Sequence, residues 1–311
     1  MLIWAFEKVG LTIQAVITFY RFALLLMLHN RSFSKTRIAP TPTGFLHAGN
    51  ALNFLLTAAL ATHYHATLLL RIDDLDRSRY RMAYAEDIFE TLAFLNIKWH
   101  EGPQRVADVE QTWSQQHRAL LYDEVLKKLR DSNKLFACVC SRTQCCNCQN
   151  KDFSLDAPNT SWRLVTDDAP VSVRTLDGNS ITAPLPAEMK DFIVRKKDGM
   201  PSYQLSSVAD DLHFGVDLIV RGDDLWPSTL AQHYLAKQLD EDLFSAICFY
   251  HHPLLKNDRS EKLSKSAGAA SLKHWRESGK SLAGFLAYLG TLLHLPQPLK
   301  SATELIPALG A

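Results

Sequence analysis

Two short segments of the sequence carry residue types that could bind a nucleoside triphosphate. The first, residues 42–50 (PTGFLHAGN), has glycines that let a ligand approach the backbone and a histidine, His47, that can hydrogen-bond to phosphate oxygens. The second, residues 262–266 (KLSKS), places two lysines among small polar residues. Together they predict a fixed cradle and a mobile cationic loop that close on one triphosphate.

The first segment lies where a strand is expected to turn into a helix. Residues 36–39 end at prolines, and apolar residues at helical spacing from Ala51 to His63 predict the helix. The N–H groups at a helix N-terminus favour anions. We therefore expect ATP to be bound by Gly44, His47, Gly49, Asn50, Lys262 and Lys265. Taken alone, each segment could instead be an ordinary turn with a surface histidine or a solvated lysine loop.

In this order, residues 47–50 (HAGN) and 262–266 resemble the two signature elements of the class I aminoacyl-tRNA synthetases. Four further segments resemble motifs of the glutamate branch of that family. They are 37–44 (RIAPTPTG), 71–76 (RIDDLD), 202–211 (SYQLSSVADD) and 220–225 (VRGDDL). The resemblance runs from about residue 35 to residue 275 and implies activation of glutamate by ATP, with Mg²⁺ bound to the ATP.

The resemblance also implies a role for each matched residue. His47 and Lys265 would be catalytic, Lys265 stabilising the triphosphate as pyrophosphate departs. Asp73, where the family usually has Glu, would hold the ammonium group of the substrate glutamate. Arg37 and Arg221 would bind the carboxylates of glutamate, since planar guanidinium groups suit bidentate carboxylate recognition. The complete glutamate set is Arg37, Thr41, Asp73, Tyr203 and Arg221. The alternatives are surface ion pairs for residues 71–76 and a core aromatic for Tyr203.

The length of the chain narrows the resemblance. The 311 residues have a net charge of +1 and are 47% hydrophobic, as in a globular protein with a sizeable core. Only 45 residues follow Ser266, too few for the anticodon-binding region of full glutamyl-tRNA synthetases, given domain sizes of about 100 residues or more. The chain therefore resembles their truncated paralogues, the glutamyl-queuosine tRNA(Asp) synthetases. This implies transfer of glutamate from its adenylate to the queuosine base in the anticodon loop of tRNA(Asp).

Two other functions stay open. One is a minimal glutamyl-tRNA synthetase that charges the 3′ end of tRNA(Glu), and the other is a non-catalytic RNA-binding paralogue. The intact His47, Lys262 and Lys265 argue against the second. We expect a monomer that works in the cytoplasm, with the tRNA(Asp) anticodon stem-loop as partner and no membrane.

Five of the six cysteines lie close together, which argues for a metal site and against disulfides. Two Cys-x-Cys arms could give four thiolates to one structural Zn²⁺, a closed site with no open position for catalysis. The expected ligands are Cys138, Cys140, Cys146 and Cys148. Cys145 competes with Cys146 for the third place, and free thiols are the alternative. Cys248, between two apolar residues, is expected in the core.

The alternation of short strands and helices predicts an α/β fold. We expect a class I synthetase Rossmann-like parallel sheet, an inserted zinc-binding or acceptor-type subdomain, and no anticodon-binding domain. Strands are expected at 36–39, 66–72, 191–195, 202–209 and 217–221, and helices at 48–63, 82–95, 111–131, 228–238 and 271–289. The expected divisions are an atypical N-terminal extension (1–33), a first half of the nucleotide-binding fold (34–100), a connective insertion with the cysteines (101–190), a second half with the KLSKS loop (191–275), and a C-terminal helix and tail (276–311).

The N-terminal extension does not follow this pattern. Residues 11–28 are largely apolar but contain Gln14 and Arg21, and the stretch is short for a membrane span. An added amphipathic helix, a signal-like segment and a start codon placed too far upstream, with Met27 as the natural beginning, are the three interpretations.

Overall fold

The computed structural model describes residues 31–140, 148, 153–255 and 271–311. Its main sheet has the strand order β2-β1-β8-β9-β5-β6. The strands are β1 (Lys35–Ile38), β2 (Thr67–Leu70), β5 (Val171–Thr175), β6 (Ser180–Ala183), β8 (Leu218–Gly222) and β9 (Cys248–His252). Neighbouring strands from β2 to β5 are parallel, and β6 closes the edge antiparallel to β5. This arrangement confirms the expected α/β fold.

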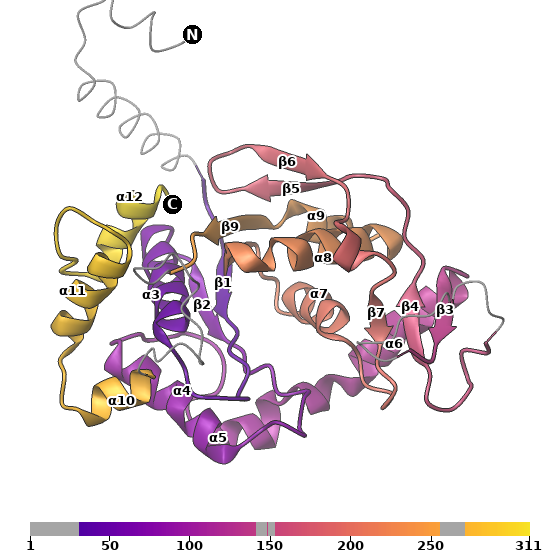
Figure 1. The fold of residues 1–311 in the computed structure, drawn as a ribbon, viewed down its shortest axis with the longest axis horizontal. Coiled ribbons are helices and arrows are strands. Elements are labelled where there is room, and N and C mark those ends of the chain that lie inside the picture. Colours follow the sequence, from indigo (N-terminus) through magenta and orange to yellow (C-terminus); the bar gives the residue numbers. More distant parts are fainter. Residues whose placement is uncertain (1–30, 141–147, 149–152, 256–270) are drawn as a thin grey trace, which may run out of the picture.

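Both faces of the sheet are covered. Alternate residues of each strand point to opposite sides, so each strand contributes to two cores. Leu68 and Val220 belong to a core shared with α3 (Ala48–His63), whereas Leu69 and Ile219 belong to a second core. The second core includes α6 (Ala119–Asp131), α7 (Tyr203–His213), α8 (Trp226–Gln238) and α9 (Asp242–Ala246). The C-terminal elements contribute apolar residues to the core that contains α3 (Figure 1). They are α10 (Leu272–Glu277), α11 (Leu282–Leu292), a 3₁₀ turn (Ala302–Glu304) and α12 (Leu305–Leu309).

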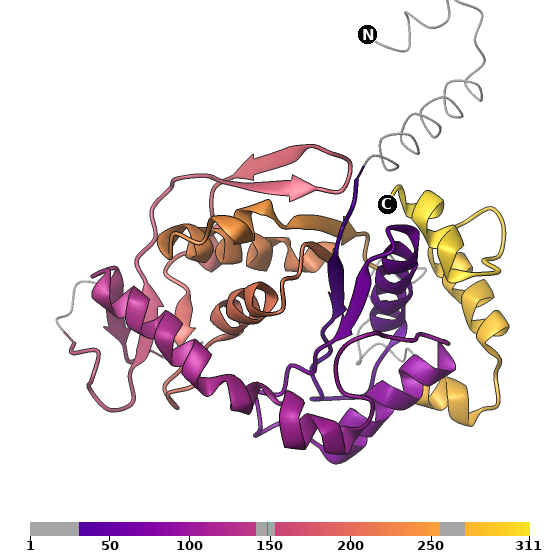
Figure 2. The same ribbon diagram turned by 180° about the vertical axis from the view of Figure 1, so that it is seen from behind.

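A second, antiparallel sheet lies at the opposite end of the molecule from α10–α12 (Figure 2). It is made of β3 (Leu135–Cys138), β4 (Ser161–Leu164) and β7 (Ile193–Arg195). The strand expected at 191–195 is therefore real, but it belongs to this sheet and not to the parallel one. Short helical segments complete the fold. They are α4 (Met82–Phe94), α5 (Val106–Asp108), a π turn (Val109–Trp113), and 3₁₀ turns at Gln115–Arg118, Ala187–Met189 and Asp223–Leu225.

Three expectations about elements are wrong. Residues 202–209, expected as a strand, form the first part of α7, which begins where the Ser202 hydroxyl accepts a hydrogen bond from the Leu205 N–H. The helix expected at 271–289 is two helices, separated at Gly279, whose φ of +68° favours glycine. The helix expected at 111–131 begins as π and 3₁₀ turns and becomes regular only at Ala119.

Several expectations concern residues outside the described part of the chain. They are those on residues 11–28, Cys145, Cys146, Lys262 and Lys265. Within the described part, no helix combines the length and the apolar character that crossing a bilayer requires.

Candidate active site

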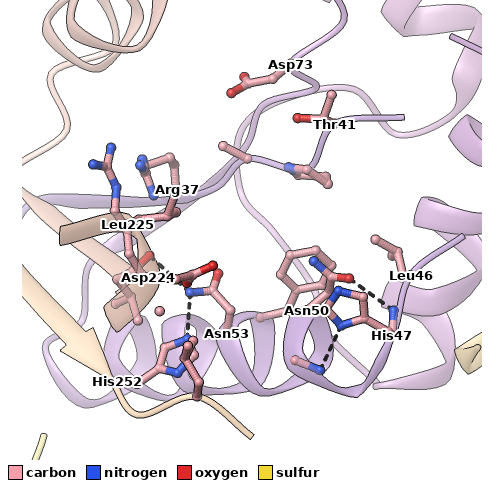
Figure 3. A pocket seen from close by; sticks show the side chains of 18 of the residues that line it. Arg37, Thr41, Leu46, His47, Asn50, Asn53, Asp73, Asp224, Leu225 and His252 are labelled. Atoms are coloured by element: carbon pink, nitrogen blue, oxygen red, sulfur yellow. Dashed lines mark hydrogen bonds between the residues drawn. The ribbon is translucent and has the colours of Figure 1, made fainter. Parts of the chain in front are cut away.

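A cavity of about 430 Å³ opens at the carboxyl ends of β1, β2 and β8, the edge where open α/β sheets bind ligands. It is bordered by the N-terminal turn of α3, where His47 and Asn50 lie (Figure 3). The first residue of α7 also lines it. The cavity brings together every expected glutamate or ATP residue that the structure describes. These are Arg37, Thr41, Gly44, His47, Gly49, Asn50, Asp73, Tyr203 and Arg221.

His47 is the N-cap of α3 and is held by the motif around it. Its Nδ1 accepts a hydrogen bond from the Gly49 N–H at 3.1 Å, and its own N–H donates to the Asn50 side-chain oxygen at 3.0 Å. This is a capping box, with histidine in place of the usual serine or threonine. Because Nδ1 accepts, the proton of the neutral ring lies on Nε2, which can donate to a phosphate oxygen. His47 is therefore a half-buried N-cap with a fixed side chain, and its role toward ATP stays a prediction.

Three arginines surround one buried carboxylate next to the cavity. Arg37 Nε and Arg71 Nη1 donate to Asp211 Oδ1 at 3.0 and 2.7 Å. Arg221 Nη2 lies 4.0 Å from Asp211 Oδ2. Burial raises the pKa of Asp211, but the charges of the three arginines outweigh it and the net direction is down. Asp211 is therefore an ionised counter-ion that keeps three guanidinium groups close together.

Asp73 is held by Arg71 in a two-pronged ion pair. Arg71 Nε donates to Oδ1 at 2.7 Å, and Nη2 donates to Oδ2 at 3.1 Å. Burial raises the pKa of the Asp73 carboxyl, and the charge of Arg71 opposes that shift. Since both residues are buried, surface ion pairing is the wrong interpretation for them. Each Asp73 oxygen keeps a second lone pair, so a contact with an ammonium group stays possible.

Arg221 is buried, and only part of its guanidinium group is hydrogen-bonded to described residues. Its Nη1 donates to Thr229 Oγ1 at 3.0 Å, and its guanidinium lies 5.2 Å from the centre of the Phe249 ring. Within the described part of the chain, Nε and Nη2 have no hydrogen-bond partner. These two atoms form the side-on edge with which a guanidinium grips a carboxylate. Burial lowers the pKa of Arg221, and an anion on that edge would offset the desolvation of the charge.

Tyr203 and Thr41 complete the wall of the cavity. Tyr203 is the first residue of α7 and is 44% exposed, so it is not a core aromatic. Thr41 lies in the loop after β1, on the side of the cavity that also carries Asp73 (Figure 3). Their roles toward glutamate stay predictions.

The described cysteines form a donor set that fits a metal. The Sγ atoms of Cys138, Cys140 and Cys148 all lie within 4.8 Å of one another, and those of Cys140 and Cys148 are 3.2 Å apart. A tetrahedral zinc with Zn–S bonds of about 2.3 Å requires sulfur–sulfur distances of about 3.8 Å. The observed separations, from 3.2 Å to at most 4.8 Å, span this value. Cys248 is buried on β9, as expected of a core residue.

The sequence motifs left several residues of the site without a role. Thr229 accepts a hydrogen bond from Arg221 and contacts His251, and Asp211 lies 4.0 Å from Arg221. Asn53 donates to the Val220 carbonyl oxygen at 3.1 Å. Asp211 was visible as part of the acidic pair Asp210–Asp211 that ends the matched segment 202–211. The others had no such signal, because single polar residues in a helix or strand do not reveal what they contact.

Comparisons with known proteins agree with this geometry. A family model described as tRNA synthetases class I (E and Q), catalytic domain, matches residues 34–163 and 178–306. The Glutamyl-Q tRNA(Asp) synthetase of Symbiobacterium thermophilum is 34% identical over 87% of this chain and 90% of its own length. That of Synechococcus sp. is 36% identical, with 87% of each chain covered.

Longer relatives match as well. The Glutamate--tRNA ligase 2 of Syntrophus aciditrophicus is 29% identical over 90% of this chain, which spans 62% of that relative. Among solved structures, the glutamate-tRNA synthetase of Elizabethkingia anophelis superposes with a TM-score of 0.68 and 21% identity. It covers 83% of this chain and 61% of its own, a likeness of fold. The chain belongs to the class I tRNA synthetases of the E and Q group, a family of ligases.

Proposed function

We propose that this enzyme joins glutamate to ATP and transfers the glutamyl group to the queuosine base in the anticodon loop of tRNA(Asp). The observation that carries the first step is the open Nε/Nη2 edge of Arg221, buried beside Arg37 in the cavity that also contains the His47 turn. A small diacid fits two such guanidinium groups. The acceptor is supported by the names of the two relatives that this chain spans almost end to end.

Each cavity residue then has a role in binding. Arg37 and Arg221 hold the carboxylates of glutamate, and Asp73 receives its ammonium group. Thr41 and Tyr203 donate hydroxyl contacts, and the turn at Gly44, Gly49 and Asn50 receives the nucleotide. Mg²⁺, when bound with ATP, would neutralise part of the charge of the phosphates.

The activation step is a displacement at phosphorus. An oxygen of the α-carboxylate forms a bond with the α-phosphorus, and the bond from that phosphorus to the bridging oxygen breaks, releasing pyrophosphate. His47 donates toward phosphate oxygens that gain charge, and Lys262 and Lys265 stabilise the leaving pyrophosphate. Positioning and electrostatics carry this step, without a covalent enzyme intermediate.

The transfer step consumes the adenylate. A hydroxyl of the queuosine diol attacks the activated carbonyl carbon, an ester bond forms, and the bond to AMP breaks. The competing function is charging of the 3′ end of tRNA(Glu), which the longer glutamate–tRNA ligase relative supports. The two functions share the activation step and differ only in the hydroxyl that attacks.

We also propose one structural zinc, bound by Cys138, Cys140 and Cys148 with Cys146 as the fourth thiolate. The three described sulfur atoms, which come from two separate segments of the chain, support it. In this proposal, residues 34–100 and 191–275 are the halves of the nucleotide-binding fold, and residues 101–190 are the insertion that carries the zinc. The boundaries are not strict, because β5 and β6 of the insertion join the main sheet and β7 of the second half joins the small sheet.

The activation step is tested by isotope exchange between pyrophosphate and ATP, with glutamate, glutamine or aspartate as the only amino acid. We expect exchange with glutamate alone, and a strong loss in Lys265→Ala without loss of folding. Assays with and without tRNA show whether RNA is needed. Exchange with glutamine in preference to glutamate, or with neither under both conditions, would contradict the proposal.

A further inference from the structure

Arg221 is hydrogen-bonded to Thr229, which contacts His251, and the proposed function uses neither of these two residues. We propose that Thr229 and His251 are positioning residues that turn the Nε/Nη2 edge of Arg221 toward a carboxylate of the substrate. This inference rests on the proposed function, because it concerns the binding of glutamate. It adds two residues that contact neither glutamate nor ATP in that function.

The hydrogen bonds among these groups have only one consistent direction. The carbonyl oxygen of Gly222 can only accept, so His251 Nδ1, 3.2 Å away, donates to it. The Nε2 atom of the neutral ring then accepts, and the Thr229 hydroxyl, 3.0 Å away, donates to it. The Thr229 oxygen is left to accept from Arg221 Nη1 at 3.0 Å. This series of hydrogen bonds starts at Arg221 and ends at Gly222, the next residue in the sequence, so it forms a closed ring of contacts.

The surroundings of His251 keep its ring neutral and in place. Burial and the charge of Arg221 lower the pKa of His251 to about 4, although Asp224 pulls the other way and His252 adds to the lowering. The ring packs against the edge of Trp226 at 5.1 Å and is stacked on Phe249 at 6.4 Å. The parallel register of β8 and β9 sets Arg221 opposite His251. At neutral pH the ring thus presents a lone pair to Thr229.

Thr229 matters because Arg221 has a competing partner. Asp211 Oδ2 lies 4.0 Å from Arg221 Nη2, and this oxygen has no hydrogen-bond partner within the described part of the chain. A small rotation of the guanidinium would bring the two atoms together and cover the open edge. The bond from Nη1 to Thr229 opposes that rotation. The relay therefore keeps the edge of Arg221 available for the substrate.

The test compares substitutions at the two positions by their effects on the separate kinetic constants of ATP–pyrophosphate exchange. Thr229→Val removes the acceptor at nearly constant volume and is expected to raise the KM for glutamate roughly tenfold, as for one lost hydrogen bond to a charge. The KM for ATP and kcat should stay within about twofold. Thr229→Ser keeps the hydroxyl and should restore the wild-type KM. His251→Phe keeps the ring packing and should raise the glutamate KM about threefold.

Each outcome decides for or against the relay. An unchanged glutamate KM in a folded Thr229→Val variant, a parallel rise in the KM for ATP, or failure of Thr229→Ser to restore binding would overturn it. If Thr229→Val does not fold, His251→Phe decides, and a glutamate KM equal to that of the wild type rejects the role. Absence of glutamate-dependent exchange in the wild type defeats the proposed function itself. Wild-type exchange with unaffected variants defeats the positioning role alone.

Discussion

At the scale of single residues, the site is organised around buried charge. Arg37, Arg71 and Arg221 are all nearly inaccessible, and Asp211 is the carboxylate they share. Bringing three guanidinium groups together without a counter-ion would be strongly unfavourable. Asp211, which no motif singled out for a role, is thus the carboxylate common to all three arginines, whereas Asp73 and Asp210 lie beside Arg71.

Removing this counter-ion should destabilise the whole protein. Asp211→Asn leaves the three arginines without their shared charge, and we expect the free energy of unfolding to fall by about 3–5 kcal/mol. Asp156→Asn is the matched control, because Asp156 pairs with Arg130 at an exposed site. Urea denaturation of both variants measures the difference. An Asp211→Asn protein as stable as the Asp156→Asn control would contradict the account of the buried cluster.

At the scale of elements, α7 connects the candidate pocket to the buried charges. Its first residue, Tyr203, lines the cavity. Near its end, Asp211 accepts hydrogen bonds from Arg37 and Arg71, and Asp210 accepts from Arg118 and Tyr122. The start of this helix therefore sets both the position of Tyr203 and the depth of the acidic pair. Ser202 caps it by accepting the Leu205 N–H at 3.4 Å.

The cap of α7 should matter for binding as well as for stability. Ser202→Ala removes the cap, and we expect about 1 kcal/mol of lost stability together with a higher KM for glutamate. Ser281→Ala is the control, because Ser281 caps α11 in the same way by accepting the Gly284 N–H at 3.1 Å. It should lose similar stability with an unchanged KM. Thermal denaturation and exchange kinetics check both variants, and equal KM values in the two would contradict the role given to α7.

The elements also show what the sequence could and could not reveal. The helix expected at 48–63 has those bounds in the structure, because its buried face is apolar. By contrast, the segment of α7 was expected as a strand although its apolar residues, Leu205, Val208, Ala209 and Leu212, stand at helical spacing and face the second core. The strand β5 was not among the expected strands, although Val171 and Val173 alternate into the second core. Hydrophobic periodicity indicates which face of an element is buried, but it does not indicate which buried polar groups contact one another.

The same limit applies to the site. The resemblance to a family placed nine described residues in one cavity, since motifs that bind one ligand converge in space. It gave no role to Asp211, Thr229 or His251, whose contacts are with other protein groups. Residues that position a binding group are set by tertiary packing, which short motifs do not encode.

At the scale of the whole molecule, the cavity of the candidate active site and the cysteine cluster belong to different parts of the fold. The cavity lies at the main sheet, and Cys138 ends β3 in the small antiparallel sheet (Figure 1). A metal there would join β3 to the segment around Cys148. Its contribution should be to the stability of this sheet and not to the binding of glutamate.

Metal analysis can test this division. We expect about one zinc per purified chain, and Cys148→Ser should lose the zinc and lower the unfolding temperature while the glutamate KM stays unchanged. Cys248→Ala is the control, since Cys248 is buried on β9 in the main sheet and should keep the zinc. Equal zinc content in the two variants, or a wild-type protein purified without metal, would contradict the site.

The whole molecule must also choose an acceptor, and one measurement tests that choice most directly. The enzyme is incubated with labelled glutamate, ATP and purified tRNA(Asp), with or without queuosine, and the RNA is then cut into anticodon-loop and 3′-terminal fragments. We predict label only with queuosine-containing tRNA(Asp), and only in the anticodon-loop fragment. Label at a 3′ end, on queuosine-free tRNA(Asp) or on tRNA(Glu) would contradict the account.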